Sequence, residues 1–198
     1  MLDTPTIGRL MRSSTTGFVF GCSVPEPDVP RFGDFVKAPA QRGQAEVFGL
    51  IYDIVIQDDP FVRQMVATPD LEEAYILDQR ENRQVPIEVS VLAIGYCAHG
   101  GAIISGFPPQ PPITLDRIRP CATAEVLACT ERFDYLRLIL NSVEAPADEL
   151  IPVSLLKAAA LQAPQDRANF LRGAGRTLAR LLARDLTRLE NLLRRIQP

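Results

Sequence analysis

The first two-thirds of the chain carry short apolar runs that alternate with polar residues, a pattern typical of β-strands. Glycine, proline or aspartate bounds these runs, as expected where strands end in turns. The predicted strands cover residues 17–21, 33–38, 46–56, 86–96 and 101–106. The pattern therefore predicts a β-rich N-terminal region.

Three features modify this pattern. Gly49 interrupts the longest apolar run, which predicts a bulge or a sharp bend in that strand. Residues 69–81 are predicted to form one helix, with Pro69 at its start and an acidic first turn. Five prolines in residues 107–120 predict an extended, rigid strut with little secondary structure of its own.

The last third of the chain changes to a helical pattern. Residues 122–130 are predicted to form one last strand, and helices are predicted over 131–141, 147–161 and 165–196. The expected fold class is α+β. We expect a strand-rich domain over residues 1–130, followed by a helical region over residues 131–198 that ends in a long amphipathic helix rich in arginine and leucine.

The composition is that of an ordinary soluble globular protein, with 198 residues, 46% apolar and 23% charged. The longest apolar stretches fall well short of the about 20 residues that a membrane-spanning helix needs. The N-terminus lacks the basic and apolar segments of a secretory signal. We therefore expect a cytoplasmic protein that does not associate with membranes.

The four cysteines are widely spaced and contain no C-x-x-C pair. We expect them to be buried thiols rather than a disulfide framework. They are Cys22, Cys97, Cys121 and Cys129.

No sequence motif indicates catalysis, and we expect a protein that is not an enzyme and uses no cofactor. The pattern G-x-x-x-x-G-K-[ST] is absent, so there is no P-loop. Gly173 and Gly175 lie within a helical stretch that no strand precedes. A helix junction or close helix packing is therefore favoured there over dinucleotide binding.

His99 is the only histidine, and it lies two residues after Cys97. A nucleophilic cysteine needs a nearby base, which makes this pair a candidate for catalysis. The preferred interpretation is a hairpin tip over 97–101, whose glycines supply positive φ angles. A zinc site built from His99 and the cysteines would lack the usual short ligand pairs, so we expect no metal site.

Asp53, Asp58 and Asp59 form a small acidic group after the long strand. Metal-dependent nucleases require carboxylates that converge on one point. A turn that ends the strand is the favoured interpretation.

The cluster Ser13-Ser14-Thr15-Thr16-Gly17 could bind a phosphate, cap a helix or turn the chain. The apolar run after it is a predicted strand, so no helix N-terminus would face an anion. We therefore expect the hydroxyl groups to satisfy backbone groups at a strand junction.

A series of short motifs occurs in order between about residues 5 and 130. It consists of Ile7-Gly8, Ser14-Thr15 with Phe18 and Phe20, Gly33-Asp34-Phe35-Val36, the strand from Val47 to Ile54, the strand PIEVSVLAIGY and the segment PPQPP. In order and spacing this series resembles the N-terminal barrel of HerA-type ATPases, the HerA–ATP synthase (HAS) barrel.

The resemblance implies a small β-barrel of the HAS type over residues 1–130. A HerA ATPase continues into a P-loop ATPase core, whereas here only the helical region follows. The resemblance thus implies a barrel domain that no P-loop ATPase core accompanies in this sequence. By analogy with the ATPases and with rotary ATP synthase subunits, such a barrel is an assembly module.

The charges are distributed unevenly along the chain. Residues 165–198 contain eight arginines and three acidic residues, whereas residues 1–164 contain 13 basic and 21 acidic residues. Five of the arginines recur at every fourth position, which places them in one stripe on a helix. They are Arg172, Arg176, Arg180, Arg184 and Arg188.

This stripe has three interpretations. It could be a solvated face softened by Asp185 and Glu190, a contact for the phosphate backbone of nucleic acid, or a docking surface for an acidic partner, including the acidic barrel of this chain. The lack of aromatic residues argues against base stacking.

A second face of the same predicted helix carries apolar residues at alternating spacings of three and four. This spacing is typical of the seam of a coiled coil or a helix bundle. The oligomer or packing seam consists of Leu182, Leu186, Leu189, Leu193 and Ile196.

Together these features predict a non-catalytic assembly or adaptor protein. It would self-associate or dock onto a larger complex through its barrel and its C-terminal helix. The alternative is a nucleic-acid-binding accessory factor of a HerA-like DNA-processing system, which would use the arginine stripe. A third hypothesis is an enzyme with an unrecognised site around His99 or the aspartates.

Overall fold

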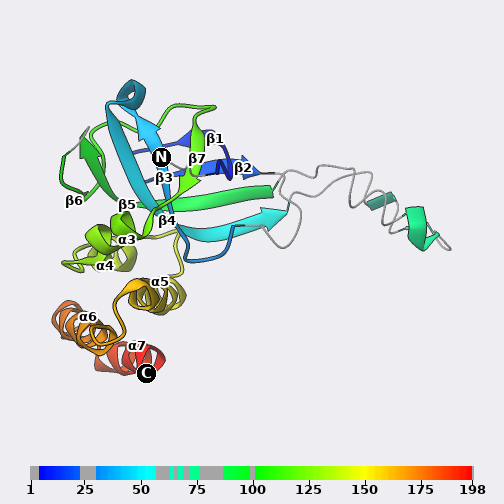
Figure 1. Ribbon diagram of the computed structural model, residues 1–198. Coiled ribbons are helices and arrows are strands. Elements are labelled where there is room, and N and C mark those ends of the chain that lie inside the picture. The colour runs from blue at the N-terminus through cyan, green and yellow to red at the C-terminus, as the bar shows by residue number, and fades with distance from the viewer. Residues whose placement is uncertain are drawn as a thin grey trace.

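The computed structural model describes residues 5–22, 30–56, 63–64, 67–68, 72–75, 87–98 and 101–197 (Figure 1). The strands within these residues are β1 (Gly8–Ser13), β2 (Gly17–Cys22), β3 (Phe35–Ala40), β4 (Ala45–Ile56), β5 (Ile87–Ala98), β6 (Ile104–Ser105) and β7 (Arg117–Pro120). A short 3-10 helix, η1 (Gln41–Gly43), joins β3 to β4. The helices that follow are α3 (Thr123–Thr130), α4 (Tyr135–Leu140), α5 (Ala147–Leu161), α6 (Arg167–Leu181) and α7 (Leu186–Ile196).

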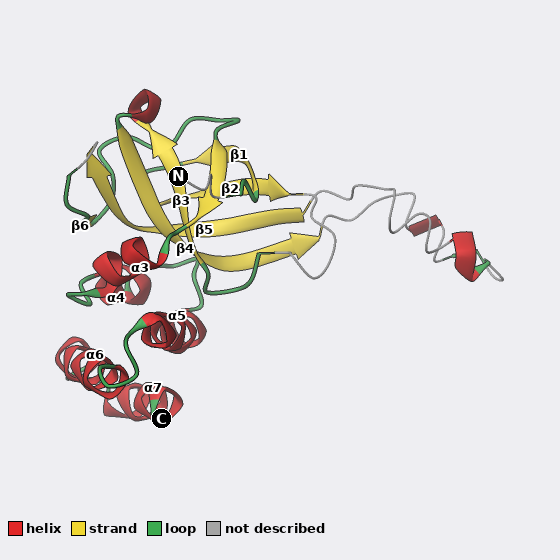
Figure 2. Ribbon diagram, viewed as in Figure 1, coloured by secondary structure: helices red, strands yellow, loops and turns green. Residues whose placement is uncertain are grey.

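Six of the strands form a closed antiparallel β-barrel. Around the barrel the order is β1, β2, β5, β4, β3 and β7, and β7 pairs with β1 to complete the circle (Figure 2). The short strand β6 pairs with the end of β5, beyond the part that β2 covers. The α+β class and the β-rich first two-thirds are therefore confirmed.

Two expectations for the segment between barrel and helices were wrong. The proline-rich segment does not stay a strut, because its last residues form β7, the strand that closes the barrel. The predicted strand at 122–130 is instead helix α3, and the Glu125 carboxylate accepts a hydrogen bond from the Ala122 N–H at 2.7 Å. This contact satisfies a donor that the first turn of a helix leaves free. The predicted helix over 69–81 lies almost entirely outside the described residues.

Side chains along the barrel strands point alternately into the barrel and outward, and some of the outward side chains form a second apolar face. Along β4, Val47 and Ile51 point into the barrel while Phe48 and Leu50 point out. The predicted irregularity at Gly49 is confirmed as a shift of register against β5. A Cβ atom at Gly49 would lie 2.4 Å from Val91 Cγ1, so only glycine fits there without rearrangement.

The barrel interior is a compact core of small and branched side chains. It consists of Leu10, Phe18, Phe20, Cys22, Val36, Ala38, Ala40, Ala45, Val47, Ile51, Val89, Val91, Ala93 and Ile118, all buried. Side chains fill this space, as is usual for small barrels.

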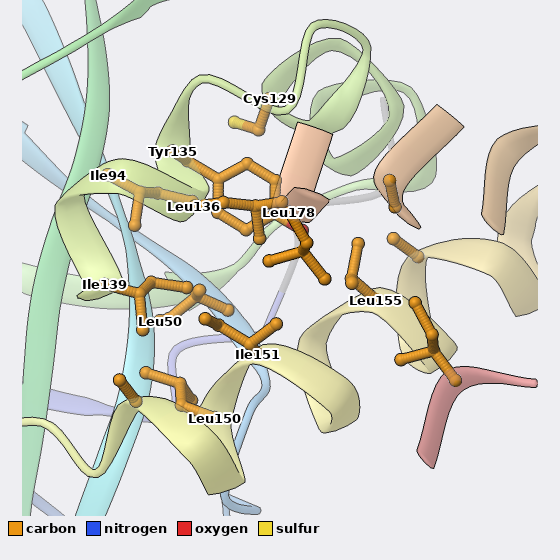
Figure 3. Close-up of a cluster of buried hydrophobic side chains, with 14 of the residues drawn as sticks. Leu50, Ile94, Cys129, Tyr135, Leu136, Ile139, Leu150, Ile151, Leu155 and Leu178 are labelled. Carbon is orange, nitrogen blue, oxygen red and sulfur yellow. The ribbon is translucent and has the colours of Figure 1, made fainter. Parts of the chain in front are cut away.

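The outer face of β3, β4 and β5 forms a second core together with the helices. The strands contribute Phe35, Phe48, Leu50, Leu92 and Ile94. Figure 3 shows Leu50 and Ile94 beside Tyr135, Ile139 and Ile151 of α4 and α5. The helices α6 and α7 pack beyond α5, farther from the barrel (Figure 1).

Polar contacts also join the barrel to the helices. Lys157 of α5 donates a hydrogen bond to the Phe32 carbonyl at 2.9 Å and forms an ion pair with Asp34. Lys37 of β3 forms an ion pair with Glu125 of α3 at 2.5 Å, and Tyr52 of β4 donates to Glu144 at 2.8 Å. Barrel and helices are thus held by apolar packing and by directed contacts.

Candidate functional site

The predicted long helix over residues 165–196 is wrong, because the chain forms two helices there. Helix α6 ends at Leu181, and α7 begins at Leu186 after a turn. The Asp185 side chain caps α7 by accepting a hydrogen bond from the Arg188 N–H at 3.1 Å. Aspartate is a favoured N-cap residue because its carboxylate satisfies an N–H with no partner inside the helix. This cap stabilises the start of α7 as a separate helix.

Close helix packing at the two glycines of α6 is confirmed. A Cβ atom at Gly173 would lie 3.0 Å from Phe133 Cε2, and one at Gly175 would lie 3.2 Å from Leu193 Cδ2. Gly175 therefore lets α7 lie directly against α6. These glycines serve helix packing, and no strand precedes them as a dinucleotide-binding loop would require.

The predicted leucine seam is divided between core and surface. Leu182 and Ile196 are buried, and Leu189 and Leu193 lie half-buried at the edge of the second core. Leu186 is 69% exposed. The exposed part of the seam lies along one side of α7 and lines a shallow groove of about 330 Å³ formed by Leu186, Leu189, Glu190, Leu193, Arg194 and Gln197.

The predicted arginine stripe is divided as well. Arg172, Arg176 and Arg180 are exposed on α6, whereas Arg184 lies in the turn and Arg188 lies on α7. Arg188 forms an ion pair with Asp148 of α5 at 2.6 Å. It therefore belongs to an internal contact and not to a continuous surface stripe.

The three stripe arginines on α6, Arg172, Arg176 and Arg180, have no acidic partner among the residues that the structure describes. Arg172 donates to the Asn169 side chain and Arg180 to the Thr177 hydroxyl, both neutral groups on the same helix. The acidic residues expected to soften the stripe act elsewhere. Asp185 caps α7, and Glu190 pairs with Arg194 at 3.1 Å. Among the described residues, no ion pair therefore compensates the charge of Arg172, Arg176 and Arg180.

Two ion pairs hold α7 against the start of α5. Besides the Arg188–Asp148 pair, the Arg195 guanidinium donates to both carboxylate oxygens of Glu149, at 2.8 and 2.5 Å. This contact lowers the pKa of Glu149. Sequence reasoning missed the role of Arg195, although its spacing of seven residues from Arg188 places both on one face of a helix.

The Ser13–Gly17 cluster forms the turn between β1 and β2, as predicted. The Ser14 hydroxyl accepts a hydrogen bond from the Thr16 N–H at 3.2 Å, and the Ser14 N–H donates to the Gly17 carbonyl at 2.8 Å. The Ser13 hydroxyl donates to the Pro112 carbonyl at 2.7 Å. The hydroxyl groups thus satisfy backbone groups at a strand junction.

Cys97, Cys121 and Cys129 are free thiols, as predicted. Cys22 and Cys129 are buried, whereas Cys97 and Cys121 are half-buried. Burial raises the pKa of Cys129 to about 12, and it also raises the pKa of Cys97 and of Cys121. A raised pKa disfavours the thiolate that a nucleophile or a metal ligand requires.

The remaining candidates for chemistry are not brought together by the described part of the chain. Asp53 is exposed, and its carboxylate accepts a hydrogen bond from the adjacent Ile54 N–H at 2.9 Å. His99, Asp58 and Asp59 lie outside the described residues. Within the described ranges, no group of three or more histidine, cysteine and acidic side chains is placed to hold a metal ion.

No model of a known protein family matches this chain, and no curated protein matches its sequence. Among the described helices, none combines the length and the apolar character needed to cross a bilayer.

Proposed function

We propose that this protein is a non-catalytic assembly or adaptor protein that acts in the cytoplasm. It self-associates or docks onto a larger complex through α7, and its barrel, which we propose to be of the HAS type, is the scaffold. The cytoplasmic assignment is supported by the free thiols of Cys97, Cys121 and Cys129, which suit a reducing compartment.

The assignment to the HAS type is supported by where the motifs lie. The Ser-Thr step forms the first turn of the barrel, the Gly-Asp pair lies just before β3, and the Val-x-Gly strand is β4. The closed antiparallel barrel is compatible with that architecture.

The docking function rests on one observation, the exposed part of the leucine seam. Leu186, Leu189 and Leu193 are spaced three and four residues apart, so they form one apolar side of α7. Glu190 and Arg194 flank it and can pair with complementary charges. A second amphipathic helix bearing apolar residues at the same spacing would cover this groove. We take a second copy of α7 as the occupant, because Glu190 and Arg194 of one copy complement Arg194 and Glu190 of an antiparallel copy.

The test is the mass of the intact protein in solution. Sedimentation equilibrium of the wild type is expected to show a concentration-dependent oligomer, and Leu186→Asp is expected to give a monomer that still unfolds cooperatively, with a melting temperature that no longer depends on protein concentration. The matched control is Leu156→Asp, because Leu156 is an exposed leucine on α5 outside the groove. A wild type that stays monomeric at high micromolar concentration contradicts self-association through α7.

A second candidate function is favoured by the stripe arginines of α6, which form no ion pair with a described residue. The alternative of a nucleic-acid-binding accessory factor in a HerA-like DNA-processing system rests on Arg172, Arg176 and Arg180. Because these arginines project on one side at intervals of about 6 Å along the helix, they could contact successive phosphates.

Fluorescence anisotropy with a labelled DNA duplex of random sequence tests this alternative. Three phosphate contacts predict a slope of about −3 in log affinity against log salt concentration. The variant Arg176→Glu/Arg180→Glu should abolish binding, while Arg42→Glu, at an exposed arginine of η1, should not. Equal binding by both variants would exclude the α6 face as the contact.

A further inference from the structure

A strip of exposed side chains lies on the barrel along β1, on the side opposite the helices. In the circular strand order β1 lies three strands from β4, whose outer face the helices cover. The chain before β7 runs antiparallel to β1. The Ser13 hydroxyl bonds the Pro112 carbonyl, and the Leu115 N–H bonds the Leu10 carbonyl at 2.8 Å. These hydrogen bonds place residues 112–117 directly beside β1.

Two arginines face each other on this strip. Arg9 of β1 and Arg117 of β7 are cross-strand partners, and both are exposed because their neighbours Leu10 and Ile118 point into the barrel. Neither forms an ion pair with a described residue; Arg9 donates only to the Leu115 carbonyl, at 3.1 Å. Like charges directly opposite each other on a sheet are destabilising. The described part of the barrel therefore places two positive charges opposite each other without an ion pair, where its own stability would favour opposite charges.

Exposed apolar residues lie close to these arginines along the chain. Leu115 is 69% exposed, and Ile113 and Met11 are about half exposed. Leu115 also has a φ angle of +72°, a conformation that costs a residue other than glycine free energy. Leu115 is thus a large aliphatic residue in a strained backbone conformation at the surface, close to two arginines that form no ion pair with a described residue.

We propose that this surface, formed by Met11, Ile113 and Leu115 with Arg9 and Arg117, is a docking site for an acidic segment of another protein. One carboxylate of the partner can accept hydrogen bonds from both guanidinium groups, because cross-strand neighbours lie about 5 Å apart. An aliphatic side chain of the partner covers Leu115. Arg12 at the edge of the strip is already paired with Glu88 at 3.3 Å, so it contributes less.

Other occupants fit this surface less well. Contact with the same surface of a second copy would bring the arginine pairs together, because a two-fold contact places a patch against itself. A phosphate backbone would match the charge but would leave the three apolar side chains without an apolar partner. The site is separate from α6 and α7, so it does not depend on the function proposed for them.

Site-specific photo-crosslinking in the native cells tests the proposal. A benzoylphenylalanine at Leu115, or at Ile113 should the first variant fold poorly, is expected to form a crosslink to one protein. The crosslinked peptide should contain at least two carboxylates and an aliphatic residue. The same group at Leu156 on α5 is the control and should not crosslink to that segment.

Charge reversal provides the decisive comparison. The double variant Arg9→Glu/Arg117→Glu should lower the crosslink yield at least tenfold, and a synthetic peptide of the mapped segment should bind the wild type but not this variant. The milder variant Arg117→Gln should raise the melting temperature of the free protein, because it removes the repulsion. The proposal is overturned by a crosslink to nucleic acid, by a crosslink to a second copy, by no crosslink, or by a lower melting temperature of Arg117→Gln.

Discussion

Removing the helices should expose an apolar face of the barrel to solvent and thereby destabilise the remaining chain. A chain shortened to residues 1–122 keeps all six barrel strands but loses α3 to α7. Five side chains on the outer face would become exposed, each at most 7% exposed in the intact protein. They are Phe35, Phe48, Leu50, Leu92 and Ile94.

The free energy at stake is comparable with the stability of a whole domain. Full burial of one such side chain contributes about 1.5–3 kcal/mol, so five contribute roughly 7–15 kcal/mol. A typical domain is stable by about 5–15 kcal/mol. We therefore expect the shortened chain to aggregate or to unfold without cooperativity, although it retains every residue of the interior barrel core.

The assay compares the shortened and the full chain by sedimentation velocity, by binding of a hydrophobic dye and by thermal melting followed with circular dichroism. A rescue variant with threonine at all five positions should be soluble and monomeric, because threonine suits a strand and tolerates water. If the unmodified fragment were monomeric and melted cooperatively, the outer face would not depend on the helices, and the reasoning from burial would be refuted.

Three further predictions concern single residues. Gly17→Ala should destabilise the barrel by about 1–3 kcal/mol in a urea titration, because its Cβ atom would lie 2.2 Å from a backbone carbonyl oxygen of β5. The control is Gly21→Ala on the same strand, where the Cβ atom meets only the flexible end of a methionine side chain. This control should lower the free energy of unfolding clearly less. Stability should fall as the pH rises from 10 to 12, because burial and a neighbouring carboxylate raise the pKa of Tyr52 from 10.0 to about 12 and the unfolded chain ionises first. Tyr52 contributes at most about 1.4 kcal/mol per pH unit to the loss of unfolding free energy, and its partial exposure reduces this value. Tyr52→Phe should therefore make the free energy of unfolding depend less on pH in this range. Because Arg195 lowers the pKa of Glu149, protonation of that carboxyl group at low pH should weaken the contact between the two side chains. As the pH falls, hydrogen exchange of the α7 amides should become faster than the intrinsic pH dependence of exchange predicts. In Glu149→Gln, exchange in α7 should follow the intrinsic pH dependence alone.

Local patterns in the sequence determined most of the secondary structure. The alternation along β4 and β5, the bulge at Gly49 and the turn at Ser14 depend on neighbouring residues and were predictable. Helix α5 has the predicted bounds of 147–161 because its apolar period and acidic first turn agree. The close packing at Gly175 was also indicated, since glycine within a helix needs a reason.

The tertiary structure decided what those elements do. Nothing local shows that Arg117–Pro120 closes the barrel, because a four-residue strand is defined by its partners β1 and β3. The periodic pattern over 165–196 could not show that α7 turns back onto α5, since the acidic residues that hold Arg188 and Arg195 lie about 40 residues earlier in the chain.

The same holds for the candidate surfaces. Sequence spacing placed Leu186 and Leu182 in one seam, yet one side chain is exposed and the other is buried, because burial depends on the elements that pack nearby. Arg9 and Arg117 are more than a hundred residues apart, and only the closure of the barrel makes them neighbours. The sequence by itself thus determined the elements, whereas long-range strand pairing and helix packing decided which side chains meet.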